Sequence, residues 1–189
     1  MVVHHSYLIY KLLNRHYIYF FYLHYKLENL INIFAFKKTL YLLTCLVKFS
    51  SFFKPTIFLE LSSFDYNNVN EHILLSFTLL YCFLLLNSSL KLFLSSSGSE
   101  DEFIYSSSTV FNNLSWSERE IGEMHNINFF EKIDSRHLLL DYSLNGNPML
   151  KTYSLVGYVE ILYNFILSIL QYIFLTVFES KKTNNVFDY

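Results

Sequence analysis

The first half of the chain alternates between apolar and polar positions in a way that predicts strands. Alternation at period two is typical of a strand that buries one face, and turn-forming residues separate the alternating runs. The runs are 17–25, which is aromatic, "NLINIF" (29–34), "TIFLELSSF" (56–64), 73–86 and 89–95. The last two flank Asn87–Ser88 and predict a hairpin. The pattern as a whole therefore predicts about five strands.

Two stretches of the same half have helical spacing instead. In "FKKTLYLLTCLVKF" (36–49), the apolar residues Leu40, Leu43 and Val47 recur on one face. This predicts a helix that packs this face on the sheet. Residues 6–15 predict a second, shorter helix.

A further helix is predicted at the start of the most charged part of the chain. In "SWSE" (115–118), a Ser at the N-cap and a Glu three residues later fit a capping box. We therefore expect a helix from Trp116 to about His125. Asn126 is a suitable stop, because Asn tolerates the left-handed backbone that ends many helices.

One face of this helix places a carboxylate among apolar side chains, since Trp116, Glu120 and Met124 follow one another at i, i+4 and i+8. A buried carboxylate must be paired or protonated. The available cations are Arg119, Arg136 and Lys151. Two interpretations are open from the residues alone. The helix is either partly exposed with surface ion pairs, or part of a buried acid–base network that holds the turn "LNGNP" (144–148). Within that turn, Asn145-Gly146 permits positive φ.

These elements predict an α+β fold. We expect a mixed sheet of about five strands with helices packed on it, followed by the motif helix and an extended C-terminal arm. A chain of 189 residues is long enough for one domain with a real core. We divide it into a sheet domain (1–106), a motif segment of the same domain (107–163) and the arm (164–189).

The run "ILYNFILSILQYIFLTVF" (161–178) carries no charge over 18 residues, which is enough for a transmembrane helix. Composition weakens this argument. Ala35 is the only alanine, and Gly (4) and Pro (2) are scarce, whereas the chain has 20 Phe and 16 Tyr. That bias is the mark of an AT-rich genome, such as that of an organelle, and it inflates hydropathy. A single-span organellar membrane protein anchored by 161–178 is therefore an alternative interpretation.

Charge and motifs exclude several function classes. The net charge of −2 offers no basic stripe for nucleic acid. The two cysteines are far apart, which excludes a zinc ribbon and a self-contained iron–sulfur site. The chain has no nucleophile elbow, phosphate loop or HExxH motif. A metal-dependent enzyme that uses Glu118, Glu120, Glu123 and His125 is a second alternative. Glu123 and His125 are two residues apart, however, where a di-iron site needs three.

The charged segment combines three motifs at fixed spacing. The first is an E-R-E followed by an acid, a basic residue and an arginine, here Glu118, Arg119, Glu120, Glu123, Lys132 and Arg136. The second is D-Y-x-x-x-G-x-P-x-x-K, here Asp141, Tyr142, Gly146, Pro148 and Lys151. The third is "GYVE" (157–160). With these motifs, residues 115–163 resemble the thirty-kilodalton (C) subunit family of respiratory complex I, NADH:ubiquinone oxidoreductase. Its mitochondrially encoded members are called NADH dehydrogenase subunit nine.

The resemblance implies a non-catalytic core subunit of the quinone module, in the matrix arm. It would support assembly and rigidity of the quinone-reducing site in proton-pumping electron transfer from NADH to ubiquinone. The residues that the resemblance marks as structural or interface residues are Trp116, Glu118, Arg119, Glu120, Glu123, Lys132, Asp134, Arg136, Asp141, Tyr142, Gly146, Pro148 and Lys151. It implies no catalytic, cofactor-binding or metal-binding residue in this chain.

The resemblance also implies a setting. FMN, iron–sulfur clusters and ubiquinone belong to the parent complex. The partners would be other complex I subunits, especially the hydrogenase-like quinone-site subunit and the terminal-cluster subunit, with no nucleic acid. The location would be the matrix side of the mitochondrial inner membrane, with membrane association through the complex. The spacing of the motifs is intact, although Asn147 stands where the family has a His.

Overall fold

The computed structural model describes residues 22–23, 30–51, 53, 55–66, 77–87, 90–99 and 103–175. The predicted helix 6–15 lies outside the described residues. So does most of the predicted strand 17–25, and the same holds for the part of the arm beyond residue 175.

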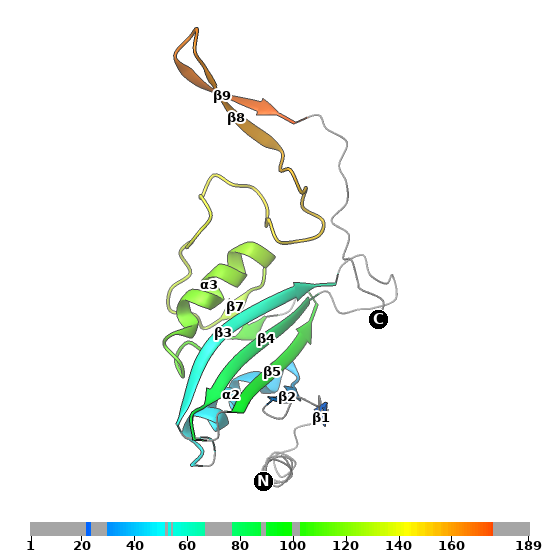
Figure 1. Ribbon diagram of the computed structural model, residues 1–189, viewed down its shortest axis with the longest axis vertical. Helices are drawn as coiled ribbons and strands as arrows, with labels where there is room; N and C mark the ends of the chain where they lie inside the picture. Colours follow the sequence, from blue (N-terminus) through cyan, green and yellow to red (C-terminus); the bar gives the residue numbers. More distant parts are fainter. Residues whose placement is uncertain are drawn as a thin grey trace.

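A five-stranded mixed sheet forms the centre of the fold (Figure 1). Its strands are β1 (Tyr22–Leu23), β2 (Leu30–Phe34), β3 (Thr56–Asp65), β4 (Phe77–Leu85) and β5 (Leu90–Gly98). Their order across the sheet is β1-β2-β5-β4-β3. β2 pairs with β5 in parallel, and the other neighbours are antiparallel. The predicted mixed sheet and the β4–β5 hairpin are confirmed.

One face of this sheet carries the core. Alternate positions of the two central strands are buried there, including Leu79 and Phe83 on β4 and Leu92 on β5. The helix α2 (Lys37–Phe49) covers part of this face with Leu40 and Leu43, which are also buried. The helix predicted over 36–49 is confirmed, because its apolar spacing matched the turn of the helix.

A bulge changes which residues of the edge strand β3 face the core. The register shifts between Phe58 and Glu60, so that two residues of β3 face one position of β4. Leu61 packs against the core as a result. Asp65 at the end of the strand is buried, at 7% exposed. The bulge therefore places a carboxylate inside the molecule at the end of β3.

The motif helix α3 (Leu114–His125) packs against β3 (Figure 1). It adds Leu114 and Ile121 to the core. Two short strands, β6 (Ile104–Tyr105) and β7 (Phe129–Phe130), pair in parallel on either side of it in the sequence. The predicted end is confirmed, since Asn126 adopts φ 56°. The predicted capping box is wrong, because the helix starts two residues before Trp116 and its N-cap residue makes no side-chain bond.

The apolar run near the end of the chain forms strands rather than a helix. β8 (Val159–Asn164) and β9 (Ile169–Phe174) pair as an antiparallel hairpin, which projects from the rest of the described chain in Figure 1. Within the described residues, no helix is long and apolar enough to cross a membrane. The interpretation of 161–178 as a membrane-spanning helix is therefore wrong for 161–175. An uncharged run does not by itself distinguish a strand pair from a helix.

Candidate functional site

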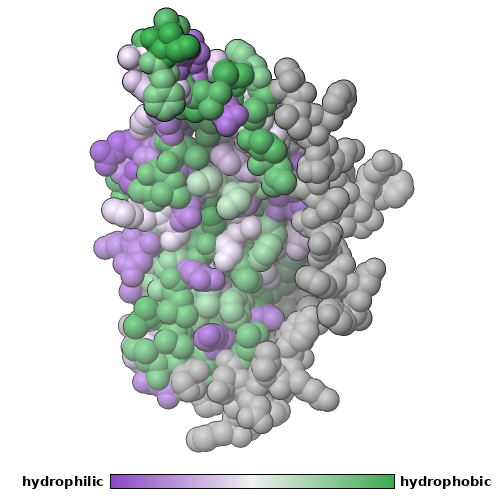
Figure 2. All heavy atoms as spheres, turned by 45° about the horizontal axis from the view of Figure 1, so that its top comes forward, coloured by the Kyte–Doolittle hydropathy of each residue, from purple (hydrophilic) through white to green (hydrophobic). Residues whose placement is uncertain are grey.

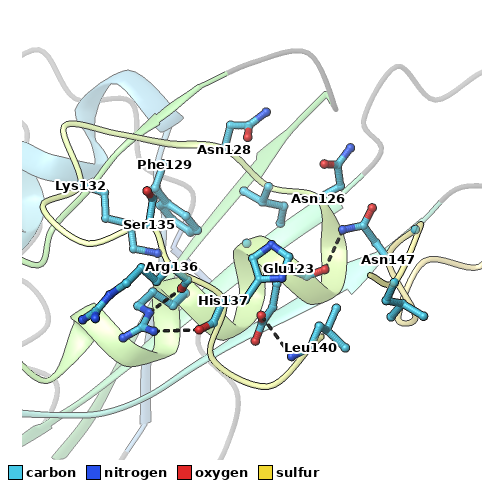
Figure 3. Close-up of a pocket in the computed structure, with 15 residues that line it drawn as sticks. Glu123, Asn126, Asn128, Phe129, Lys132, Ser135, Arg136, His137, Leu140 and Asn147 are labelled. Atoms are coloured by element: carbon cyan, nitrogen blue, oxygen red, sulfur yellow. Dashed lines mark hydrogen bonds between the residues drawn. The ribbon is translucent and has the colours of Figure 1, made fainter. Parts of the chain in front are cut away.

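The charged side chains of α3 organise the irregular segments around it. These segments are 106–108 before the helix, 134–140 after it, and 146–151 beyond. Most of their backbone groups have no strand or helix partner, so side chains must supply the hydrogen bonds. Figure 3 shows how the second and third segments meet the C-terminal half of α3.

Glu123 binds three consecutive peptide groups. Its carboxylate accepts N–H bonds from Leu138 (2.9 Å), Leu139 (2.7 Å) and Leu140 (3.3 Å). The residue is buried, at 8% exposed. Burial alone would raise the pKa of Glu123, but the three N–H bonds and nearby His137 outweigh it, so the pKa lies below its ordinary value. The carboxylate is therefore held in its charged form by the loop backbone.

Arg119 lies one turn before Glu123 and binds the preceding part of the same loop. Its Nε donates to the carbonyl of Arg136 (2.8 Å) and its Nη2 to the carbonyl of His137 (3.0 Å). Its Nη1 reaches Asp134 at 3.4 Å. Arg119 and Glu123, which we call the clamp, thus bind five consecutive residues through two carbonyls and three N–H groups. A guanidinium suits this role because its donors are held in a fixed plane.

Asp134 stabilises a local turn in this loop by binding Arg136, two residues further on. It accepts from Arg136 through the backbone N (3.1 Å), Nε (3.0 Å) and Nη2 (2.8 Å). These bonds hold the pKa of Asp134 far below its ordinary value and raise that of Arg136. The Arg136 side chain is 76% exposed, so the pair is screened by water and adds geometry more than stability.

Glu118 acts on the opposite side of α3, toward the segment 106–108. It is fully buried and accepts from the hydroxyl of Ser106 (2.6 Å) and the backbone N of Ser107 (2.9 Å). Burial raises the pKa of Glu118, and these bonds with the charge of Lys132 offset it only in part. Glu118 therefore fixes the segment 106–108 to α3. A hydroxyl and an N–H group, rather than a cation, contact its carboxylate directly.

The segment 146–151 closes the C-terminal end of α3. The side-chain amide of Asn147 donates to the carbonyl of Glu123 (2.6 Å), and the Met149 N–H donates to the carbonyl of Met124 (3.1 Å). These bonds satisfy helix carbonyls that have no partner within the helix. The Lys151 N–H donates to Asp65 at 2.8 Å, which fixes this segment to the end of β3.

The predicted turn around Asn145-Gly146 is confirmed, with a positive φ of 113° at Gly146. A Cβ at this position would lie 2.8 Å from the ring of Tyr153. Both the backbone conformation and the close ring therefore favour glycine here.

A pocket of about 340 Å³ lies between α3, the segment 126–137 and the turn 144–147 (Figure 3). Its lining includes Gly122, Ile127 and Leu140, and Lys132, Arg136 and His137 are cationic or potentially cationic. The pocket is mixed in character, with apolar and polar groups side by side.

The structure corrects the choice of the buried carboxylate. We expected Glu120 to share an apolar face with Trp116 and Met124, but Glu120 is exposed and Trp116 is 67% exposed. The buried carboxylates are Glu118 and Glu123. The expected cations also act differently, since Arg119 and Arg136 bind the loop backbone and Asp134.

Other predicted residues lie in the loops that α3 holds. Tyr142 is exposed, stacks on the His137 ring at a centroid distance of 4.5 Å, and accepts a hydrogen bond from the His137 N–H. Asp141 is exposed and accepts from Ser143. Pro148 lies in the closing segment beside Asn147. Sequence reasoning missed the roles of Asp65, Ser106 and Asn147. The hydrogen bonds of these three residues join positions that are 86, 12 and 24 residues apart in the sequence, so no local sequence pattern predicts them.

The described residues contain no group of three or more His, Cys, Asp or Glu that could hold a metal ion. The second alternative, a metal site built from Glu118, Glu120, Glu123 and His125, therefore does not form. Glu118 and Glu123 point to different loops, and Glu120 points to solvent.

The fold of the described residues is shared with solved structures. One solved structure with this fold is a trypsin-resistant fragment of Nqo5, with a TM-score of 0.56, 11% identity, and coverage of 69% of this chain and 98% of that chain. Another is a chain of the membrane-bound sulfane sulfur reductase, an archaeal respiratory membrane complex, with a TM-score of 0.57, 12% identity, and coverage of 72% and 78%. At such identities the likeness shows the fold alone.

Sequence comparison gives the family. The profile described as "Respiratory-chain NADH dehydrogenase, 30 Kd subunit" matches residues 37–159. The chain belongs to this family, the thirty-kilodalton subunit of complex I, which confirms the resemblance seen in its motifs.

Curated relatives carry the corresponding names. The C subunit of NADH-quinone oxidoreductase from Rickettsia bellii is 36% identical over 88 residues, 47% of this chain and 45% of the relative. NADH-ubiquinone oxidoreductase subunit 9 of Paramecium primaurelia is 36% identical over 104 residues, which are 55% of this chain and 47% of the relative. NADH dehydrogenase [ubiquinone] iron-sulfur protein 3 of Beta trigyna is 28% identical over 125 residues, which are 66% of this chain and 63% of the relative. The chain thus spans about half the length of the first two relatives.

Proposed function

We propose that this chain is a non-catalytic core subunit of the quinone module, in the matrix arm of mitochondrial NADH:ubiquinone oxidoreductase. In this role it supports assembly and rigidity of the quinone-reducing site during proton-pumping electron transfer. The observation that carries the proposal is the clamp. Arg119 and Glu123 direct their charges to the backbone of the chain itself, which fixes a loop and leaves that loop's side chains for contact with others.

The fixed loops present apolar side chains to the outside. The exposed apolar residues of this region are Ile133, Leu139, Tyr142, Leu144 and Met149. Exposed apolar patches of this kind are typical of surfaces that a partner protein covers. A rigid loop also loses less conformational entropy on binding than a mobile one. The clamp therefore suits a subunit whose task is to hold its neighbours in place.

The β8–β9 hairpin is the second surface that supports this proposal. One of its faces carries only apolar and aromatic side chains, namely Val159, Ile161, Tyr163, Leu170, Tyr172 and Phe174. The other face mixes Glu160, Asn164 and Gln171 with apolar residues. Figure 2 shows apolar side chains gathered at the top of the molecule. A two-stranded hairpin is marginally stable alone, so we infer that the apolar face is covered by a neighbouring subunit.

The proposal places the redox groups in other subunits. FMN, iron–sulfur clusters and ubiquinone would be held by the parent complex, and the neighbours would include the hydrogenase-like quinone-site subunit and the terminal-cluster subunit. One relative is named an iron-sulfur protein. This chain has two cysteines, whereas clusters usually need four thiolate ligands.

The test is a native gel of gently solubilised mitochondrial membranes, stained for NADH dehydrogenase activity and searched by mass spectrometry. We expect peptides of this chain in a very large active band, at one copy per complex. Migration of the chain apart from that band would contradict the proposal.

A matched pair of hairpin variants tests the covered face. Tyr172→Ser changes the apolar face, and Gln171→Ser changes the other face one residue away. We expect Tyr172→Ser to lower the amount of chain in the active band and Gln171→Ser to leave it unchanged. Equal incorporation of both would show that the apolar face is not buried by a partner.

A further inference from the structure

The charged acceptors at the pocket beside α3 already have donors within the chain. The Glu123 carboxylate is occupied by three N–H groups of the loop. Asp134, beside the lining, is occupied by Arg136 and Arg119. The carbonyls of Arg136 and His137 are occupied by Arg119. The negative groups at this site therefore already have internal donors.

Donors remain in the same pocket. Within the described part of the chain, the Lys132 ammonium makes no hydrogen bond or ion pair, and it lies 5.6 Å from the centroid of the Phe129 ring. The side chains of Asn126, Asn128 and Ser135 also line the pocket and make no hydrogen bond within the described residues. In Figure 3 the Lys132 side chain extends toward α3.

The charge on Lys132 is only partly balanced. Lys132 is half-buried, and burial lowers its pKa, while Glu118, Asp134 and Glu123 raise it and Arg119 lowers it further. These three carboxylates each accept hydrogen bonds from other groups of the chain. An ammonium in this position gains most from an acceptor that enters from outside.

We propose that the pocket receives a carboxylate side chain, an Asp or Glu of a neighbouring polypeptide, which pairs with Lys132 and accepts from the pocket amides. The inference rests on the proposed function and names the chemistry of the partner at the same site. A pocket of about 340 Å³ is near the lower end of ligand-site volumes. It has room for one acidic side chain with its methylenes against Ile127 and Leu140.

A partner side chain fits better than a free anion because of the surroundings. Ile133 stands next to Lys132 in the sequence and is 86% exposed, and Leu139 next to Leu140 is 58% exposed. Leu144 lines the pocket and is also exposed. A charged group with exposed apolar side chains close by along the chain is typical of a protein interface, where apolar contacts exclude water from the charged pair.

The experiment compares Lys132 in the intact complex and in the isolated full-length chain. Acetylation by an amine-reactive ester is measured by mass spectrometry, with exposed Lys91 on β5 as the reference within each sample. Because an ammonium that is paired with a carboxylate is held away from the reagent, we expect Lys132 to react about tenfold or more slowly in the complex. A carbodiimide, which joins contacting amines and carboxylates, should then link Lys132 to an Asp or Glu of another subunit.

The outcomes separate the inference from the proposed function. Equal reactivity of Lys132 in the two samples, or no cross-link from Lys132 to another subunit, overturns the inference while the chain remains in the complex. Protection of the isolated chain by added inorganic phosphate, without an intersubunit cross-link, assigns the pocket to a free anion and also overturns it. Absence of the chain from the complex overturns the proposed function itself.

Discussion

Replacing Glu123 by Gln tests whether one carboxylate fixes the loop that follows α3. Glu123 accepts three backbone N–H bonds, at 2.7 to 3.3 Å, from three successive residues. Gln keeps the shape of the side chain but offers only one acceptor oxygen. Its NH₂ group would face an N–H donor where the second carboxylate oxygen stands now. At least one loop N–H therefore loses its partner.

The magnitude follows from the number of bonds and their exposure. A hydrogen bond to a charged group contributes about 1.5–3 kcal/mol, and an unsatisfied buried donor costs about 1–3 kcal/mol. Leu139 is 58% exposed, so water can reach part of the loop and replace one bond. We therefore expect Glu123→Gln to lower the free energy of unfolding by about 2–4 kcal/mol.

The assay is urea unfolding of the purified chain, followed by the fluorescence of Trp116, the only Trp and itself part of α3. With a urea dependence of about 1–3 kcal/mol per molar, the midpoint should fall by roughly 1–2 M. The matched control is Glu120→Gln, which neutralises an exposed carboxylate on the same helix. We expect the control to stay within about 0.5 kcal/mol of the wild type.

Equal midpoints for the two variants would refute the reasoning. The pH dependence gives a second check. The folded pKa of Glu123 is lowered, so its stabilisation is present above the ordinary value of 4.5 and is lost as the pH falls through the lower folded value. The wild type should accordingly lose its advantage over Glu123→Gln in acid.

Three further predictions concern the groups around the clamp. Arg119→Lys should cost about 1–2 kcal/mol, because an ammonium cannot bond both loop carbonyls in one plane; an unchanged urea midpoint would contradict this. The raised folded pKa of Glu118 means that its carboxyl stabilises most below the ordinary value and loses this as the pH rises through the folded value. The stability of the wild type relative to Glu118→Gln should therefore fall as the pH rises above 4.5, and a difference in midpoints that does not change with pH would count against a buried carboxyl. Gly146→Ala should cost about 1–3 kcal/mol through its positive φ and the contact with Tyr153. Gly157→Ala, where an added Cβ would meet no atom within 4 Å, should cost less, and equal losses would rule out the ring contact.

The sheet could be predicted from the sequence because a strand that buries one face has apolar residues at every second position. Leu79, Tyr81 and Phe83 are buried in β4, and the residues between them are less so. The same holds for α2, where the spacing of Leu40, Leu43 and Val47 follows the helix turn. Such patterns depend on neighbours in the sequence, so one sequence is enough to find them.

The sequence motifs named residues of the candidate site, but they did not show which atoms these residues contact. The motifs included Arg119 and Glu123, but the assignment of the buried face of α3 was wrong. We took the face of Trp116 and Met124, at i and i+8, as the apolar one. The structure instead buries Leu114, Glu118 and Ile121. A carboxylate that accepts from backbone N–H groups can be buried without a cation. The sequence cannot mark such partners, because almost every residue has a backbone N–H. The hairpin was missed because an uncharged run has no period.

The bond between the Lys151 N–H and Asp65 has a consequence for the order of folding. It joins residues 86 positions apart, whereas the clamp joins α3 to residues within about 20 positions. Short loops close at lower entropic cost than long ones. As the chain leaves the ribosome, the sheet and α3 can therefore form before the segment 146–151 exists. The segment 146–151 is synthesised after both, and it then packs on the ends of α3 and β3. On the proposed function, a chain truncated before residue 146 should retain its core yet fail to enter the complex.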